Sequence, residues 1–170
     1  GEPLGPNWTM RYRPPQDEPA LLAALAQAAG SQDFANRVDL LLAQLREQGA
    51  VVYLNATLRS RERGYLMWGA FHLSRAANAA ELDARVEQLR RANEGWGLRV
   101  PIAWRHPAGW QATREAAREM ADTYEVVFAS EKGARSSRHY DGEAVDFVAV
   151  GLPRRLHLRA PGGAEARGNG

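Results

Sequence analysis

The sequence has 170 residues, no cysteine and a formal net charge of +2, a length that fits one domain with a buried core. Its hydrophobic fraction of 45% indicates a globular rather than a disordered chain. The absence of cysteine excludes disulfides and cysteine-rich zinc sites. The sequence lacks a run of about 18 apolar residues, so we expect no transmembrane helix. It also lacks a basic run interleaved with aromatic residues, so we expect no nucleic-acid partner.

The first part of the chain predicts an arm followed by helices. Residues 1–16 are rich in proline and glycine and predict an extended arm whose aromatic side chains pack on the domain. Two helices follow, with Asp17 and Ser31 as their N-caps and leucines at three- and four-residue spacing. We therefore expect residues 1–49 to form a helical N-terminal extension that packs on the rest of the protein.

The middle of the chain alternates strands and helices. Residues 51–54 predict a strand, and residues 65–73 predict an apolar helix docked under the sheet. Asn78 and Thr113 start two further helices, and residues 124–129 predict another strand. The expected fold class is α+β, with a small antiparallel sheet packed against several helices.

A histidine and an aspartate stand seven positions apart near the C-terminal end. His139 precedes Asp141-Gly142, a turn signal that a helix interior tolerates poorly. Asp146 stands in the apolar run of residues 145–150, which predicts a buried strand. Both side chains can then converge on one point, and an imidazole and a carboxylate are two ligands of a typical catalytic zinc site. A simple turn between strands that happens to carry both residues is the alternative.

The spacing of five residues around this pair resembles a family signature. Ser137, His139, Gly142, Ala144 and Asp146 match the Ser-x-His-x-x-Gly-x-Ala-x-Asp pattern of the M15 metallopeptidases, which include D-alanyl-D-alanine carboxypeptidases and share a zinc fold with the Hedgehog signalling domain. The resemblance covers roughly residues 50–150. It implies that His139 and Asp146 bind Zn²⁺ with a second histidine, and that Ser137 orients a ligand or the loop, although a plain turn-forming role for Ser137 is also open.

Arg59 is the candidate catalytic residue outside this motif. The segment 56–60 is similar to the Ser-Gly-Tyr-Arg-Ser strand end of the family, although Ala56 and Thr57 differ from it. The family resemblance implies that Arg59 holds the substrate or the developing oxyanion, and a guanidinium offers the fixed fork of donors that this needs. A surface salt bridge within residues 59–63 is the alternative.

The resemblance implies a second histidine as third metal ligand, and the candidates within this chain are His72, His106 and His157. His157 is nearest in sequence to the motif and is the candidate we assign. A hairpin centred near Pro153 counts against it, because His157 would then pair with Val150, about 13 Å along the strand from Asp146. His106 is more typical of a turn cap, and His72 of a packed helix residue.

The family's remaining parts lie several tens of residues beyond the aspartate, where a glutamate precedes a Trp-His pair. This chain has 24 residues after Asp146, and they contain no such segment. The chain is then shortened, or its site is completed differently, or it is not a working peptidase. Glu143 and Asp141 do not match the family position of the general base, so we assign none.

The resemblance implies a zinc-dependent carboxypeptidase or endopeptidase that hydrolyses D-amino-acid-containing peptidoglycan peptides. Its core would be residues 50–159, followed by a mobile tail at 160–170. Its partner would be the peptidoglycan stem peptide, and its location would be the periplasm or the cell envelope. The sequence does not exclude a cytoplasmic location and does not indicate an oligomeric state. The first alternative is a non-catalytic metal-binding or cell-wall-binding relative that keeps the scaffold. The second is a helical interaction protein with a coincidental motif, to which metal would add no thermal stability.

Overall fold

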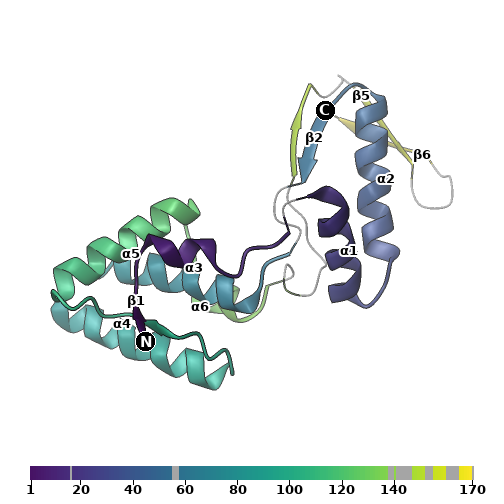
Figure 1. Cartoon of the computed structure of the whole chain (residues 1–170). Helices are drawn as coiled ribbons and strands as arrows, with labels where there is room; N and C mark the ends of the chain where they lie inside the picture. The colour runs from purple at the N-terminus through teal and green to yellow at the C-terminus, as the bar shows by residue number, and fades with distance from the viewer. Residues whose placement is uncertain are drawn as a thin grey trace. The chain divides into compact units, whose positions relative to one another are not determined.

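The chain folds into two units that are each compact. A computed structural model describes residues 1–15, 17–54, 58–137, 140, 147–151, 155–159 and 165–169. Unit 1 comprises Gly1–Arg13 and Ser60–Ser137, and unit 2 comprises Pro14–Arg59 and Arg138–Gly170. The fold is α+β and mainly helical (Figure 1), as the sequence predicts. The predicted boundary after residue 49 falls inside unit 2.

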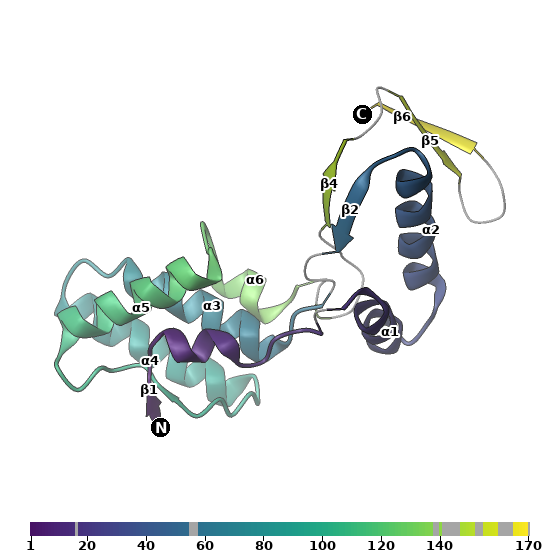
Figure 2. The same ribbon diagram turned by 45° about the horizontal axis from the view of Figure 1, so that its top comes forward.

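Unit 1 is a helical assembly with a short N-terminal segment laid against it. Its elements are β1 (Glu2–Pro3), the 3-10 helix η1 (Pro6–Met10), α3 (Arg61–Ser74), α4 (Ala79–Gly95), β3 (Ile102–Ala103), α5 (Trp110–Tyr124) and α6 (Glu131–Arg135). Helix α3 contacts α4, α5, α6 and η1. Figure 2 shows η1, in purple, running beside α3 and α5. The predicted arm is therefore a 3-10 turn whose Trp8 is buried in the core.

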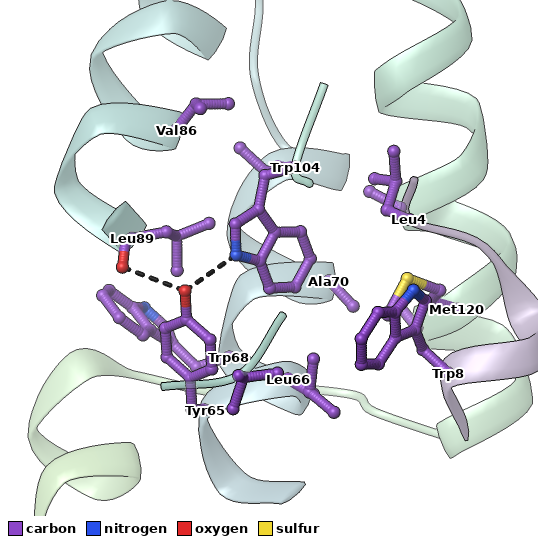
Figure 3. Packing of buried hydrophobic residues seen from close by; sticks show 14 of the residues in the cluster. Leu4, Trp8, Tyr65, Leu66, Trp68, Ala70, Val86, Leu89, Trp104 and Met120 are labelled. Carbon is purple, nitrogen blue, oxygen red and sulfur yellow. Dashed lines mark hydrogen bonds between the residues drawn. The ribbon is translucent and has the colours of Figure 1, made fainter. Parts of the chain in front are cut away.

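The core of unit 1 is organised around the aromatic side chains of α3 (Figure 3). The Tyr65 hydroxyl accepts a hydrogen bond from Trp104 Nε1 at 2.8 Å and donates one to the Leu89 carbonyl at 3.0 Å. Burial raises the pKa of Tyr65 to about 12, so this hydroxyl keeps its proton at neutral pH. The ring of Trp104 lies against Gly69, where an added Cβ would come within 2.4 Å of it. Only glycine fits at position 69 with this tryptophan in place.

Two expectations for unit 1 are wrong. The helix predicted over 65–73 is present in α3, but it packs among helices, and the β2–β4 sheet belongs to unit 2. Residues 124–129 form no strand: α5 continues to Tyr124 and ends with Glu125 in the left-handed conformation. Val127 and Phe128 are then 88% and 76% exposed. Within the described residues this apolar run pairs with no strand, and pairing is what a strand requires.

The described residues of unit 2 form two helices and two small sheets. Its elements are α1 (Glu18–Ala29), α2 (Asp33–Glu47), β2 (Val51–Leu54), β4 (Phe147–Val150), β5 (Arg155–Arg159) and β6 (Glu165–Asn169). The antiparallel pairs are β2–β4 and β5–β6, whereas the remaining pair, β1–β3 of unit 1, is parallel. Asp17 caps α1 as predicted, by accepting a hydrogen bond from the Ala20 N–H at 3.1 Å.

Strand β2 is tied to both helices of unit 2. Val52 is buried with leucines of α1 and α2, such as Leu25 and Leu42. Arg46 of α2 donates two hydrogen bonds to the Glu18 carboxylate, at 2.7 and 3.0 Å, and a third to the Val52 carbonyl at 2.8 Å. One guanidinium thus joins α1, α2 and β2, and this fixes the strand on which the candidate site depends.

Two expectations for the C-terminal segment also differ from the structure. The predicted hairpin is wrong, because β4 pairs with β2 and β5 pairs with β6. The predicted tail at 160–170 contains strand β6. Across the ranges that the structure describes, no helix has the length and apolar character needed to cross a membrane.

Candidate functional site

The paired strands β2 and β4 bring the two candidate segments to one end of a sheet. In this antiparallel pair Leu54 lies opposite Phe147, and Val51 lies opposite Val150. The last residue of β2 is thus beside the first residue of β4. The chain reaches β4 directly from Asp146, and it leaves β2 toward Arg59. Arg59 is five positions after Leu54, and a chain of this length spans at most about 18 Å.

The outer face of this sheet is apolar and exposed. Val51 and Val150, which lie opposite each other, are 50% and 60% exposed, and Tyr53 is 62% exposed. The prediction of a buried strand over 145–150 is wrong for Val150. Val52, between Val51 and Tyr53, points into the core of unit 2 instead. The sheet therefore has one face on the helices and one face open.

Arg59 lies in unit 2, just before the boundary with unit 1. It is half-buried, and no described carboxylate forms an ion pair with it. Its neighbour Arg63 has other contacts: it donates to the Thr9 carbonyl at 2.9 Å and lies over the Tyr124 ring. The salt bridge considered for residues 59–63 is absent among the described side chains. The Arg59 guanidinium is therefore available to an anionic group.

The two predicted metal ligands of the motif, His139 and Asp146, lie outside the described residues. Ser137 is described: it is half-buried and follows Ser136, the C-cap of α6. The side chains of His139 and Asp146 fit zinc chemically, because imidazole nitrogen and carboxylate oxygen are both ordinary ligands of that ion. His139 and Asp146 both belong to unit 2, together with Arg59.

His157, the assigned third ligand, lies in the middle of β5. Its backbone partner is Arg167 of β6, not Val150 as the predicted hairpin would require. The position of His157 is therefore not set by a hairpin with β4. Whether His157 is a ligand stays a prediction.

The other two histidines have structural roles in unit 1. His106 Nδ1 accepts a hydrogen bond from the Ala108 N–H at 3.0 Å, so it caps a turn. His72 stacks on Trp68, and its Nε2 lies 2.8 Å from Gln88 Oε1. Desolvation lowers the pKa of His72, and nearby Arg85 lowers it further. Neither histidine belongs to a group of three or more possible metal-ligating side chains, and the described part of the chain holds no such group.

One cluster of charged residues was not assigned a role from the sequence. Arg61, Lys132 and Arg135 line one depression in unit 1, although they come from α3 and from the distant α6. The sequence offered one signal for it, since Lys132 is the sole lysine among many arginines. Nothing in the spacing of 61 and 132 indicates that the two side chains meet.

Comparisons of the chain with protein-family models, with curated proteins and with solved structures found no match.

Proposed function

We propose that this chain carries part of the zinc site of a peptidase that resembles the M15 metallopeptidases and has a Hedgehog-like fold. The substrates would be peptides of peptidoglycan that contain D-amino acids, cut by carboxypeptidase or endopeptidase action in the periplasm or cell envelope. The observation that carries the proposal is the five-position motif of residues 137–146, which is followed directly by strand β4.

The pairing of β4 with β2 supports this proposal. A zinc peptidase needs an electrophilic or anion-binding group near its metal, because the attacked carbonyl develops negative charge. The Leu54–Phe147 pair puts the chain that leads to Arg59 and the chain that comes from Asp146 at the same sheet end. Segments about 90 residues apart in sequence thus share one location in unit 2.

In this proposal each residue has a distinct role. His139 and Asp146 would hold the ion, with His157 as the candidate third ligand. Zinc, when bound, supplies a Lewis acid and an acidified water molecule. Arg59 would bind the substrate carboxylate or the oxyanion through its planar fork, a role that lysine does not fill equally well.

The proposal is tested by zinc content and hydrolysis on the same preparations. We expect about one zinc ion per chain, lost in His139→Ala and in Asp146→Ala, because removal of one ligand weakens a site of few ligands strongly. A synthetic peptide ending in D-Ala-D-Ala is the substrate, and released D-alanine is the measurement. Arg59→Lys should keep the zinc and lose hydrolysis.

His106→Asn is the matched control, because asparagine keeps an acceptor for the Ala108 N–H and leaves the proposed ligands untouched. It should bind zinc as the unaltered chain does. If His139→Ala binds as much zinc as His106→Asn, the proposal is wrong. Zinc binding without hydrolysis, lost in His139→Ala, would instead favour the non-catalytic metal-binding relative.

A further inference from the structure

An open depression of about 640 Å³ lies on unit 1 between the start of α3 and the short helix α6. Its lining residues are Arg61, Glu131, Lys132, Arg135 and Ser136. Arg61 is the first residue of α3, and the other four come from α6 and its C-cap. The two helices are in contact, so the depression is built from packed elements.

The depression has more positive than negative charge. Three cationic side chains face one carboxylate, and that carboxylate has another partner: Glu131 Oε2 accepts a hydrogen bond from Gln88 Nε2 at 2.9 Å. No carboxylate in the described part of the chain forms an ion pair with Arg61, Lys132 or Arg135. The positive charge of the depression is thus not neutralised within unit 1.

Most other arginines of unit 1 have a carboxylate or an aromatic ring as a partner. Several form ion pairs with nearby carboxylates: Arg11, Arg85, Arg90, Arg91, Arg105 and Arg118. Others lie over aromatic rings: Arg63, Arg75 and Arg114. The three cations of the depression therefore differ from the usual pattern of this unit.

The arrangement has an electrostatic cost for the fold. Arg61 occupies the first turn of a 14-residue helix, where the helix dipole disfavours a cation. Lys132 and Arg135 are three residues apart on α6, a spacing at which like charges repel each other. An anion in the depression would offset both effects at once.

We propose that this depression binds a multivalent oxyanion, a ligand with two or more carboxylate or phosphate groups. Arginine forks bind the planar oxygens of either group in a bidentate manner, and lysine adds a point charge. The depression is wide enough for a ligand larger than a single anion. The site uses residues of unit 1 alone, so it does not depend on the zinc proposal.

The chain offers a direct probe, because Lys132 is its sole lysine. In a preparation of these 170 residues, the α-amine of Gly1 is a second primary amine and serves as the reference. Acetylation of both amines is followed by mass spectrometry at constant ionic strength. The added anion is pyrophosphate, tricarballylate or, as the reference, chloride. At a concentration near twice the Kd, a bound anion should slow acetylation of Lys132 about threefold. Labelling of Gly1 should not change.

The variants connect protection to the proposed ligands. Arg61→Gln and Arg135→Gln should each remove the protection of Lys132, whereas Arg118→Gln, the same charge change at an exposed residue of α5, should keep it. Tryptophan fluorescence confirms that each variant is folded. Protection by tricarballylate alone assigns a carboxylate ligand, and protection by pyrophosphate alone assigns a phosphate ligand. Equal protection by chloride, protection that survives in Arg61→Gln, or no protection by either multivalent anion would overturn the proposal.

Discussion

The two units differ in the kind of core that holds them together. Unit 1 buries three tryptophans and a tyrosine, with a hydrogen-bonded Trp104–Tyr65–Leu89 chain inside. Unit 2 buries leucine, valine and alanine, and Arg46 links its elements from a partly exposed position. Aromatic rings with fixed hydrogen bonds specify one arrangement more strongly than aliphatic side chains do. The predicted zinc ligands stand in the unit with the simpler core.

This difference also gives each unit its own spectroscopic signal. All the tryptophans of the chain, at positions 8, 68, 96, 104 and 110, belong to unit 1. Tryptophan fluorescence therefore follows unit 1 alone, whereas far-ultraviolet circular dichroism follows the helices of both units. The two signals can be compared in a single urea titration.

The largest effect is expected from Trp104→Ala. The side chain is 4% exposed, and its loss removes a hydrogen bond to the buried Tyr65 hydroxyl and leaves a cavity beside Gly69. We expect unit 1 to lose about 3–5 kcal/mol of unfolding free energy, measured by the fluorescence midpoint in urea. Trp110→Ala, at a partly exposed position on α5, is the control and should cost less. Equal losses in both variants would mean that the aromatic core is not the main source of stability.

A smaller effect, in the other unit, is expected from Leu42→Ala. Leu42 is 1% exposed in the core of unit 2, and truncation of a buried leucine costs about 2–5 kcal/mol. The circular dichroism signal should show an earlier transition, while the fluorescence midpoint stays unchanged. A matching shift of the fluorescence midpoint would show that the two units unfold together and not independently.

The smallest effect is a difference in pH dependence between the units. In unit 1 desolvation and Arg85 lower the pKa of His72 below 6.5, against opposing contributions from Gln88, Glu131 and Glu81. The unfolded chain then binds more protons than the folded one, so the stability of unit 1 falls as the pH drops below 6.5 toward the lowered pKa. Fluorescence midpoints at about pH 7 and about pH 5.5 measure this change. His72→Gln should reduce it.

In unit 2 the relevant group is Glu18, whose pKa is lowered below 4.5 by its hydrogen bond from Arg46. Its contribution is present above pH 4.5 and is lost as the pH falls through the lowered pKa. Glu18 should therefore contribute no change to the dichroism midpoint of unit 2 between about pH 7 and about pH 5.5. A decrease there that Glu18→Gln does not alter would point to another group.

Some local parts of the fold were predictable from sequence, because they depend on neighbours along the chain. Asp17 and Asn78 are the N-caps of α1 and α4 as expected, and Asn78 Oδ1 accepts from the Glu81 N–H at 2.9 Å. Strand pairing was not predictable in the same way. The sequence suggested that β4 pairs with its neighbour in the chain, whereas it pairs with β2, about 90 residues earlier.

The candidate site also has a part that the sequence predicts and a part that only the three-dimensional structure reveals. The motif of residues 137–146 can be found from spacing alone, and its role as a zinc site stays a prediction. That Arg59 has no ion pair with any described carboxylate is a property of three-dimensional contacts, and the run of charges over 59–63 gave no indication of it. The depression between α3 and α6 was missed for the same reason.

The interleaving of the two units has a consequence for the order in which they are made. Trp8 is synthesised early, but its partners in α3 and α5 leave the ribosome only after the whole of residues 14–59, which belong to unit 2. Strand β2 likewise waits for β4, made almost a hundred residues later. Neither unit can be completed before the other has begun, and no single cut of the chain separates them. Residues 1–13 therefore contain a piece of core that cannot pack until α3 and α5 have been made.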